Sequence, residues 1–85
     1  MWHYVYILEN ETGRQYVGST TNIGNRLHKH NKGDVPHTAK FRPWKVVYAS
    51  SFPSKKQALE FEKYLKSGSG TIFRYRHLAP NKLAK

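Results

Sequence analysis

The chain contains no cysteine among its 85 residues, so neither a disulfide framework nor a cysteine-based zinc site can stabilise the fold. Long apolar runs are missing as well: the longest, Tyr4 to Leu8, falls far short of the ~20 residues that span a bilayer. No basic segment followed by an apolar one stands at the N-terminus, as a secretory leader would require. We therefore expect a soluble, cytoplasmic protein that makes no use of a membrane.

Acidic residues are scarce: five Asp and Glu stand against fifteen Lys and Arg, which gives a formal net charge of +10. Such a charge attracts polyanions over a Debye length of about 8 Å at physiological salt. The basic residues alternate with aromatic ones over 37–45 and 71–77, an arrangement suited to phosphate contacts beside stacking surfaces. Nucleic acid is the favoured partner, and a merely solvated basic surface is the alternative. No obligate protein partner is evident.

Three segments have the composition of β-strands. His3–Leu8 and the segment that starts at Gln15 flank the turn cluster Asn10–Gly13, which predicts an N-terminal hairpin. Trp44–Ser50 is rich in strand formers and predicts a third strand. The strands together predict a small antiparallel sheet.

Capping signals delimit the helices. Asn22 and its neighbours offer N-cap side chains, and Gly33 suits a C-terminus, so the first helix is predicted over about 22–32. The proline-containing stretch 34–43 is predicted to be a loop. Ser54 followed by Gln57 forms a capping-box pattern that opens a helix ended by Ser67–Gly70, and a last helix is predicted over about 71–79.

The element order strand, strand, helix, strand, helix, helix predicts an α+β fold, a three-stranded antiparallel sheet flanked by helices. No linker divides the chain, so residues 1–80 are expected to form one domain. The basic tail, residues 81–85, is expected to fray.

Glu62 stands out on the second long helix. At about 100° per residue, it falls about 40° from Ala58 and so within the apolar arc, whereas Glu60 falls on the opposite face. A carboxylate facing the core is costly unless it is paired or holds a metal. Glu62 could therefore bind a divalent cation or a catalytic arginine, or it could reach out to Lys63 or Lys66.

Arg26 and His30 flank the apolar seam of the first helix together, one turn apart. A guanidinium beside an imidazole is well placed to bind an anion. Taken alone, the pair is more simply a solvent-directed arginine and a satisfied histidine at the core edge. Tyr6 and Tyr16, on the two hairpin strands, are singly ordinary packing residues, and Gly18 marks either a close approach or a plain strand end.

Together these residues resemble the GIY-YIG nuclease family, and in particular its small single-domain members. Tyr4–Tyr6 (YVY) stands for the first signature triplet and Tyr16–Gly18 (YVG) for the second, followed by Arg26, His30 and Glu62 in order. Tyr4 replaces the usual glycine, which in the family is not a chemical participant. The resemblance implies a divalent-metal-dependent endonuclease acting on DNA.

The resemblance also implies residue roles. Glu62 would hold one Mg²⁺ or Mn²⁺, and Arg26 would donate hydrogen bonds to the scissile phosphate. Tyr6, with a phenol pKa lowered by the metal and nearby cations, would take the proton from the attacking water, while His30 and Tyr16 orient the phosphate or relay the proton. His37, Lys40 and Asn81 stand near positions where some members carry further functional residues.

The remaining basic and aromatic residues are predicted to bind nucleic acid without reading sequence. The predicted backbone contacts are Lys40, Arg42, Lys45, Arg74, Arg76 and Lys82, and the predicted stacking residues are Phe41, Trp44, Phe73 and Tyr75. Without a recognition helix, single-stranded or structured DNA is the expected preference. The alternatives to a nuclease are a catalytically weak nucleic-acid-binding module on the same fold and a purely structural adaptor.

Overall fold

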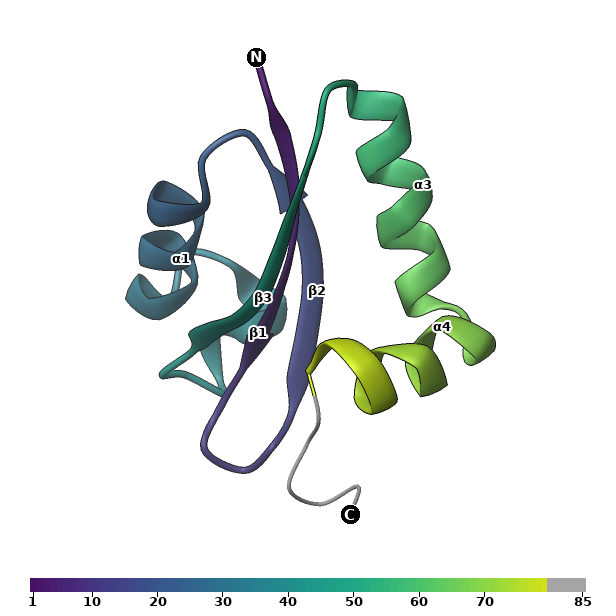
Figure 1. Cartoon of the computed structure of the whole chain (residues 1–85). Coiled ribbons are helices and arrows are strands. Elements are labelled where there is room, and N and C mark those ends of the chain that lie inside the picture. The colour runs from purple at the N-terminus through teal and green to yellow at the C-terminus, as the bar shows by residue number, and fades with distance from the viewer. Residues whose placement is uncertain (80–85) are drawn as a thin grey trace.

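The computed structural model describes residues 1–79, and its centre is a three-stranded antiparallel sheet in the order β2-β1-β3 (Figure 1). The strands are β1 (His3–Glu9), β2 (Gln15–Thr20) and β3 (Lys45–Phe52). Asn10 fixes the hairpin turn, because its Oδ1 accepts hydrogen bonds from the backbone amides of Thr12 and Arg14 at 3.1 and 2.9 Å. The predicted fold class and element order are confirmed, and β2 is left as an edge strand.

The two long helices begin where the capping residues predict. Helix α1 (Ile23–Lys32) opens at Asn22, whose Oδ1 accepts the amide proton of Asn25 at 3.0 Å, and ends at Gly33 with φ of 91°. Helix α3 (Lys55–Lys66) opens at Ser54, whose Oγ accepts from the amide of Gln57 at 3.2 Å. No helix within residues 1–79 is long and apolar enough to cross a membrane.

Two segments differ from the prediction. The stretch expected to be a loop contains a short helix, α2 (Pro36–Ala39), because a proline is well suited to the first helical turn. The last helix begins three residues earlier than expected, as α4 (Gly68–Phe73), and continues as the π-helical turn η1 (Arg74–Leu78). Ser67 closes α3 and also caps α4, where its Oγ accepts from the amide of Gly70.

Gly70 allows α4 to fold back on α3. A Cβ added at Gly70 would collide with the backbone carbonyl of Tyr64, so only glycine permits this approach. The segment predicted simply to end a helix therefore forms a tight corner between two helices. The predicted tail, residues 81–85, lies outside the described residues.

Helices cover both faces of the sheet, with α1 on one side and α3 and α4 on the other (Figure 1). On the α3 side, an aliphatic core contains Val5, Ile7, Val17, Ala58 and Leu65. On the α1 side, Tyr6, Leu8 and Trp44 form a second core against which Tyr16 and Leu27 pack. Because side chains alternate along a strand, β1 directs Tyr6 to one core and Ile7 to the other.

Candidate active site

Tyr6 lies in the central strand directly opposite Gly18 of β2, and the two residues fit together closely. A Cβ added at Gly18 would lie 2.5 Å from the Tyr6 hydroxyl and 3.1 Å from Cε2 of Tyr16. The side chain of Tyr6 is buried, and its ring centroid is 6.5 Å from that of Tyr16. Of the two explanations for Gly18, close approach is therefore the one that the structure supports.

His30 brings helix α1 into contact with these tyrosines. Its side chain is completely buried, deeper than the core-edge position that the helical pattern suggested. Nε2 lies 3.0 Å from the Tyr6 hydroxyl, Nδ1 lies 2.7 Å from Oγ1 of Thr38, and the ring is 4.9 Å from that of Tyr16. Burial, followed by the charge of Arg26, lowers the pKa of His30, so the imidazole is neutral at pH 7.

Arg26 presents its guanidinium to the same place from one turn earlier in α1. Its interaction with the Tyr6 hydroxyl raises the pKa of Arg26 above the usual value for arginine. Nε is buried, and within residues 1–79 it has no hydrogen-bond partner. A buried donor without a partner is costly, so an anion that reached this side of the guanidinium would gain a hydrogen bond there.

The Tyr6 phenol does not have the lowered pKa that was expected. Its pKa is raised, chiefly by burial and further by the nearby Tyr16 and Glu62, although Arg26 opposes the shift. The expectation concerned Tyr6 beside a bound metal ion and stays a prediction for that state; in the protein by itself, desolvation outweighs the opposing effect of Arg26. Tyr6 therefore holds its proton at neutral pH.

Glu62 approaches this cluster from α3, on the other side of the sheet, with 19 % of its side chain exposed. Oε1 accepts a hydrogen bond from Oγ of Ser19 at 2.7 Å, and Oε2 accepts one from Nζ of Lys66 at 2.7 Å. The hydrogen bond with Lys66 agrees with one of the alternatives that the sequence left open, in which Glu62 reaches out to Lys63 or Lys66. Glu62 nevertheless raises the pKa values of both Tyr6 and Arg26, so its charge also acts on the α1 side.

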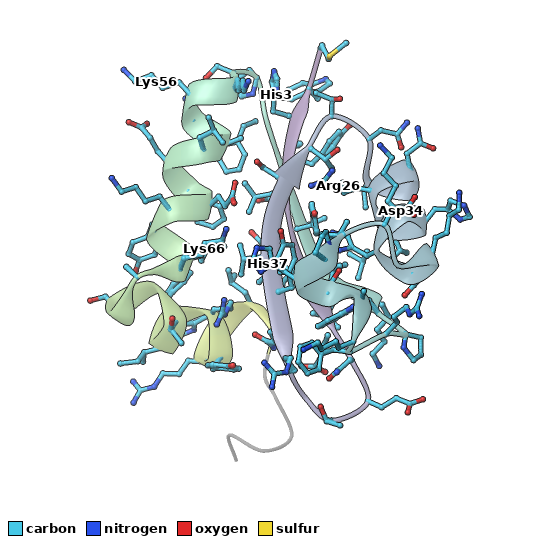
Figure 2. All side chains as sticks on the ribbon, turned by 180° about the vertical axis from the view of Figure 1, so that it is seen from behind. His3, Arg26, Asp34, His37, Lys56 and Lys66 are labelled. Carbon is cyan, nitrogen blue, oxygen red and sulfur yellow. The ribbon has the colours of Figure 1, made fainter. Side chains whose placement is uncertain are left out.

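Side chains from the α1 side and the α3 side of the sheet come together at the edge strand β2. Figure 2 shows Arg26 on α1 and Lys66 on α3 extending toward β2 from opposite sides. Nζ of Lys66 lies 5.8 Å from the centroid of the Tyr16 ring, which belongs to the α1 side. Because β2 pairs only with β1 in the described part of the chain, its other edge is open to groups from both helical layers.

Glu62 is the residue that would hold a metal ion at this edge. No group of three or more His, Cys, Asp or Glu side chains within residues 1–79 could hold a metal. A single carboxylate suits Mg²⁺, which keeps most of its waters. Each oxygen of Glu62 accepts one hydrogen bond, and the ammonium of Lys66 on Oε2 would repel a cation, so the carboxylate fits a hydrated cation best once Lys66 has moved away.

Two of the predicted nucleic-acid contacts are wrong because the residues are buried. Trp44 is 4 % exposed, and its Nε1 donates to the backbone oxygen of Thr38 at 3.0 Å, so it cannot stack on a base. Arg74 is 9 % exposed, with its guanidinium 5.1 Å from the Tyr75 ring, so it is not a surface contact for phosphate. The other predicted cations within residues 1–79 are exposed: Lys40, Arg42, Lys45 and Arg76.

Two further predicted residues, Asn81 and Lys82, lie outside the described part of the chain. Sequence reasoning missed Ser19 and Thr38, which hold Glu62 and His30 respectively. Ser19 directly follows the signature glycine and could have been suspected from that position. Thr38 lies in the stretch expected to be a loop, and no local pattern connects it with His30.

Comparisons with known proteins show the family of this chain. A family model described as the GIY-YIG catalytic domain matches residues 2–76. The chain belongs to the GIY-YIG family. Its members are generally nucleases, so nucleic acid is the substrate class that GIY-YIG membership implies.

Two relatives and a solved structure to which this chain is similar are all UPF0213 proteins. UPF0213 protein BH0048 of Halalkalibacterium halodurans is 40 % identical over 67 residues, or 78 % of this chain and 71 % of the relative. A UPF0213 protein of Streptococcus pneumoniae serotype 4 is 41 % identical over 64 residues, or 74 % of this chain and 65 % of the relative. The solution NMR structure of UPF0213 protein BH0048 from Bacillus halodurans aligns with a TM-score of 0.56 at 34 % identity and covers 94 % of this chain and 89 % of that one.

Proposed function

We propose that this protein is a divalent-metal-dependent endonuclease that hydrolyses phosphodiester bonds of DNA at the edge of β2. The observation that carries the proposal is the convergence of Tyr6, His30 and Arg26 beside Gly18, with one donor of Arg26 lacking a partner within residues 1–79. A binding module would need the arginine, but it would not need a buried tyrosine hydrogen-bonded to a neutral histidine.

Arg26 is the residue proposed to bind the scissile phosphate. The guanidinium offers donors in a planar arrangement that matches two phosphate oxygens. Nε gains a partner when the phosphate binds, and the Tyr6 hydroxyl lies beside the same guanidinium. Phosphate and proton acceptor are thereby held next to each other, which is how positioning contributes to rate.

Tyr6 and His30 are proposed to carry the proton. Because the pKa of Tyr6 is raised, the phenol can accept a proton from water only as its own proton leaves for Nε2 of His30. The water oxygen then forms a bond to phosphorus, the bond from phosphorus to the 3′ oxygen breaks, and the leaving oxygen takes a proton from solvent. The neutral state of His30 makes this transfer possible.

Glu62 is proposed to hold Mg²⁺ or Mn²⁺ after Lys66 has moved from Oε2. The cation would supply charge neutralisation on the phosphate and on the leaving oxygen. Ser19 keeps Oε1 in place through its hydrogen bond, so the carboxylate stays oriented when Lys66 leaves. The ammonium of Lys66 is then free to contact a phosphate.

A preference for unpaired DNA is proposed from the surface of α3, α4 and η1. Tyr64, Phe73 and His77 form a row with ring centroids 6.1 and 5.0 Å apart, and Tyr64 and Phe73 are exposed. Residues 63–79 contain no acidic residue, and three of their cations are exposed: Lys63, Lys66 and Arg76. Stacking on such rings contributes about 1–3 kcal/mol per base and needs bases that are not paired.

The test is cleavage of labelled single-stranded and double-stranded DNA with Mg²⁺ by the wild type, Arg26→Gln and Glu62→Gln. Glu60→Gln is the matched control, because Glu60 is exposed on the same helix. We expect the wild type and the control to cleave and the two site variants to lose cleavage. Binding without cleavage by the wild type would instead support the alternative, a nucleic-acid-binding module.

A further inference from the structure

Thr38 lies behind His30, on the side away from Tyr6, and connects the proposed proton acceptor to the short helix α2. It is 1 % exposed, and its Oγ1 is 2.7 Å from Nδ1 of His30 and 3.3 Å from the backbone oxygen of Val35. The contacts form a chain of hydrogen bonds through Tyr6, His30, Thr38 and Val35. Neither family membership nor the site residues predicted from the sequence assign a role to Thr38.

The number of protons on these groups decides which group donates in each hydrogen bond of the series. A neutral imidazole has one N–H, and each hydroxyl has one proton to donate. If Thr38 donated to Nδ1, Nε2 would carry the imidazole proton, and the buried Tyr6 hydroxyl would have no acceptor within residues 1–79. If Nδ1–H donates to Thr38, the Thr38 hydroxyl donates to Val35 and Tyr6 donates to Nε2, so every proton has an acceptor.

We propose that Thr38 is a positioning residue, which accepts the Nδ1 proton of His30 and thereby leaves Nε2 as the acceptor for the Tyr6 hydroxyl. The hydrogen bond at one ring nitrogen sets the protonation of the other, so a single hydroxyl selects the tautomer. The consequence for catalysis rests on the proposed function, in which Nε2 receives the proton of Tyr6. The tautomer itself can be measured without DNA.

The backbone of Thr38 is held by a separate hydrogen bond. Its carbonyl oxygen accepts from Nε1 of the buried Trp44 at 3.0 Å. Asn31, the residue after His30, holds the Trp44 backbone by accepting from its amide at 2.6 Å and donating to its oxygen at 3.0 Å. Trp44, which cannot stack on a base, thus has a different use: it keeps Thr38 within reach of His30.

The test compares wild type, Thr38→Val and Thr38→Ser by ¹⁵N NMR of the histidine ring nitrogens at a pH where His30 is neutral. Valine has nearly the same shape but no acceptor, whereas serine keeps the hydroxyl. We expect an Nδ1–H tautomer in the wild type and Thr38→Ser, and a shift toward Nε2–H in Thr38→Val. Thr71→Val, which removes a hydroxyl from α4, should leave the tautomer unchanged.

Cleavage is measured on the same variants. Thr38→Val should lower kcat about tenfold to a hundredfold with little change in DNA affinity, and Thr38→Ser should restore most of the rate, because a wrong tautomer removes the acceptor. An Nε2–H tautomer in the folded wild type, or an unchanged tautomer in folded Thr38→Val, would overturn the proposal. Absence of cleavage by the wild type would overturn the proposed function, while the NMR result still decides the role of Thr38.

Discussion

The two faces of the sheet are built from different kinds of interaction. The face toward α3 is an aliphatic core, in which Val5, Ile7 and Leu65 are fully buried. The face toward α1 carries the buried network of Tyr6, His30 and Thr38, whose contacts depend on hydrogen-bond direction and distance. Aliphatic burial is roughly proportional to area and tolerates small shifts, whereas a hydrogen-bonded network does not. The α3 face is held by apolar packing, whereas on the α1 face a polar network is built into a second core of Tyr6, Leu8 and Trp44.

The largest effect should follow from breaking the network at its centre. Tyr6→Phe removes the hydroxyl that faces both Arg26 and His30 and leaves Nε2 without its donor. We expect cleavage to fall by about 10²–10⁴-fold, the range for loss of a general acid or base. Tyr4→Phe, two residues earlier on β1, is the matched control and should cleave normally. Equal loss in both variants would refute a specific role for the Tyr6 hydroxyl.

A substitution in the aliphatic core should lower stability and leave cleavage nearly unchanged. Leu65→Ala removes a fully buried side chain from the core beneath α3 and should lower the free energy of unfolding by about 2–5 kcal/mol. Cleavage per folded molecule should change little, because Leu65 belongs to the aliphatic core and Tyr6 to the other core. Urea unfolding followed by circular dichroism measures the first quantity, and cleavage at low temperature measures the second. A large loss of specific activity would show that the two faces are not separable.

Gly18→Ala should affect both stability and cleavage, because Gly18 lies in β2 directly opposite Tyr6. The added methyl group would lie 2.5 Å from the Tyr6 hydroxyl, so this ring or strand β2 must shift, which disturbs the contact between Tyr6 and His30. Overpacking of this kind costs about 1–3 kcal/mol of unfolding free energy, and cleavage should fall as well. Gly24→Ala is the control, because a Cβ there meets only one side-chain atom at ordinary distance. Normal cleavage by Gly18→Ala would mean that the close approach has no functional value.

The smallest expected effect is the pH dependence that His30 gives to the free energy of unfolding. The pKa of His30 is lower in the folded protein than in the unfolded chain, so the unfolded chain binds more protons at mildly acidic pH. The stability that neutral His30 contributes is fully present above the pKa of the unfolded chain, about 6.5. It is lost as the pH falls toward the lower pKa of the folded protein. Urea unfolding between pH 7.5 and 5 should show this loss for the wild type. His30→Gln should lose less stability over the same range, and identical slopes would contradict the assignment.

Local sequence signals account for most of the fold. Asn22, Ser54 and Gly33 delimit the two long helices because capping involves residues only a few positions apart. Helical periodicity is also a local property, which is why it could predict that Arg26 and His30 turn inward. The locality of these signals also explains the errors at 34–43 and 68–70, where a proline-started turn and a close contact between helices outweigh the local composition.

The sequence by itself therefore determined the element order, the charge, the GIY-YIG pattern and the side chains that turn inward. Only the tertiary structure decided what those side chains meet: Thr38 behind His30, Lys66 and Ser19 on Glu62, and burial around Tyr6 and Trp44. Periodicity reports the direction of a side chain from its own element, but it does not report which residues of other elements will pack there. Burial, hydrogen-bond partners and pKa shifts depend on those residues, so they appear only when helices and sheet are assembled.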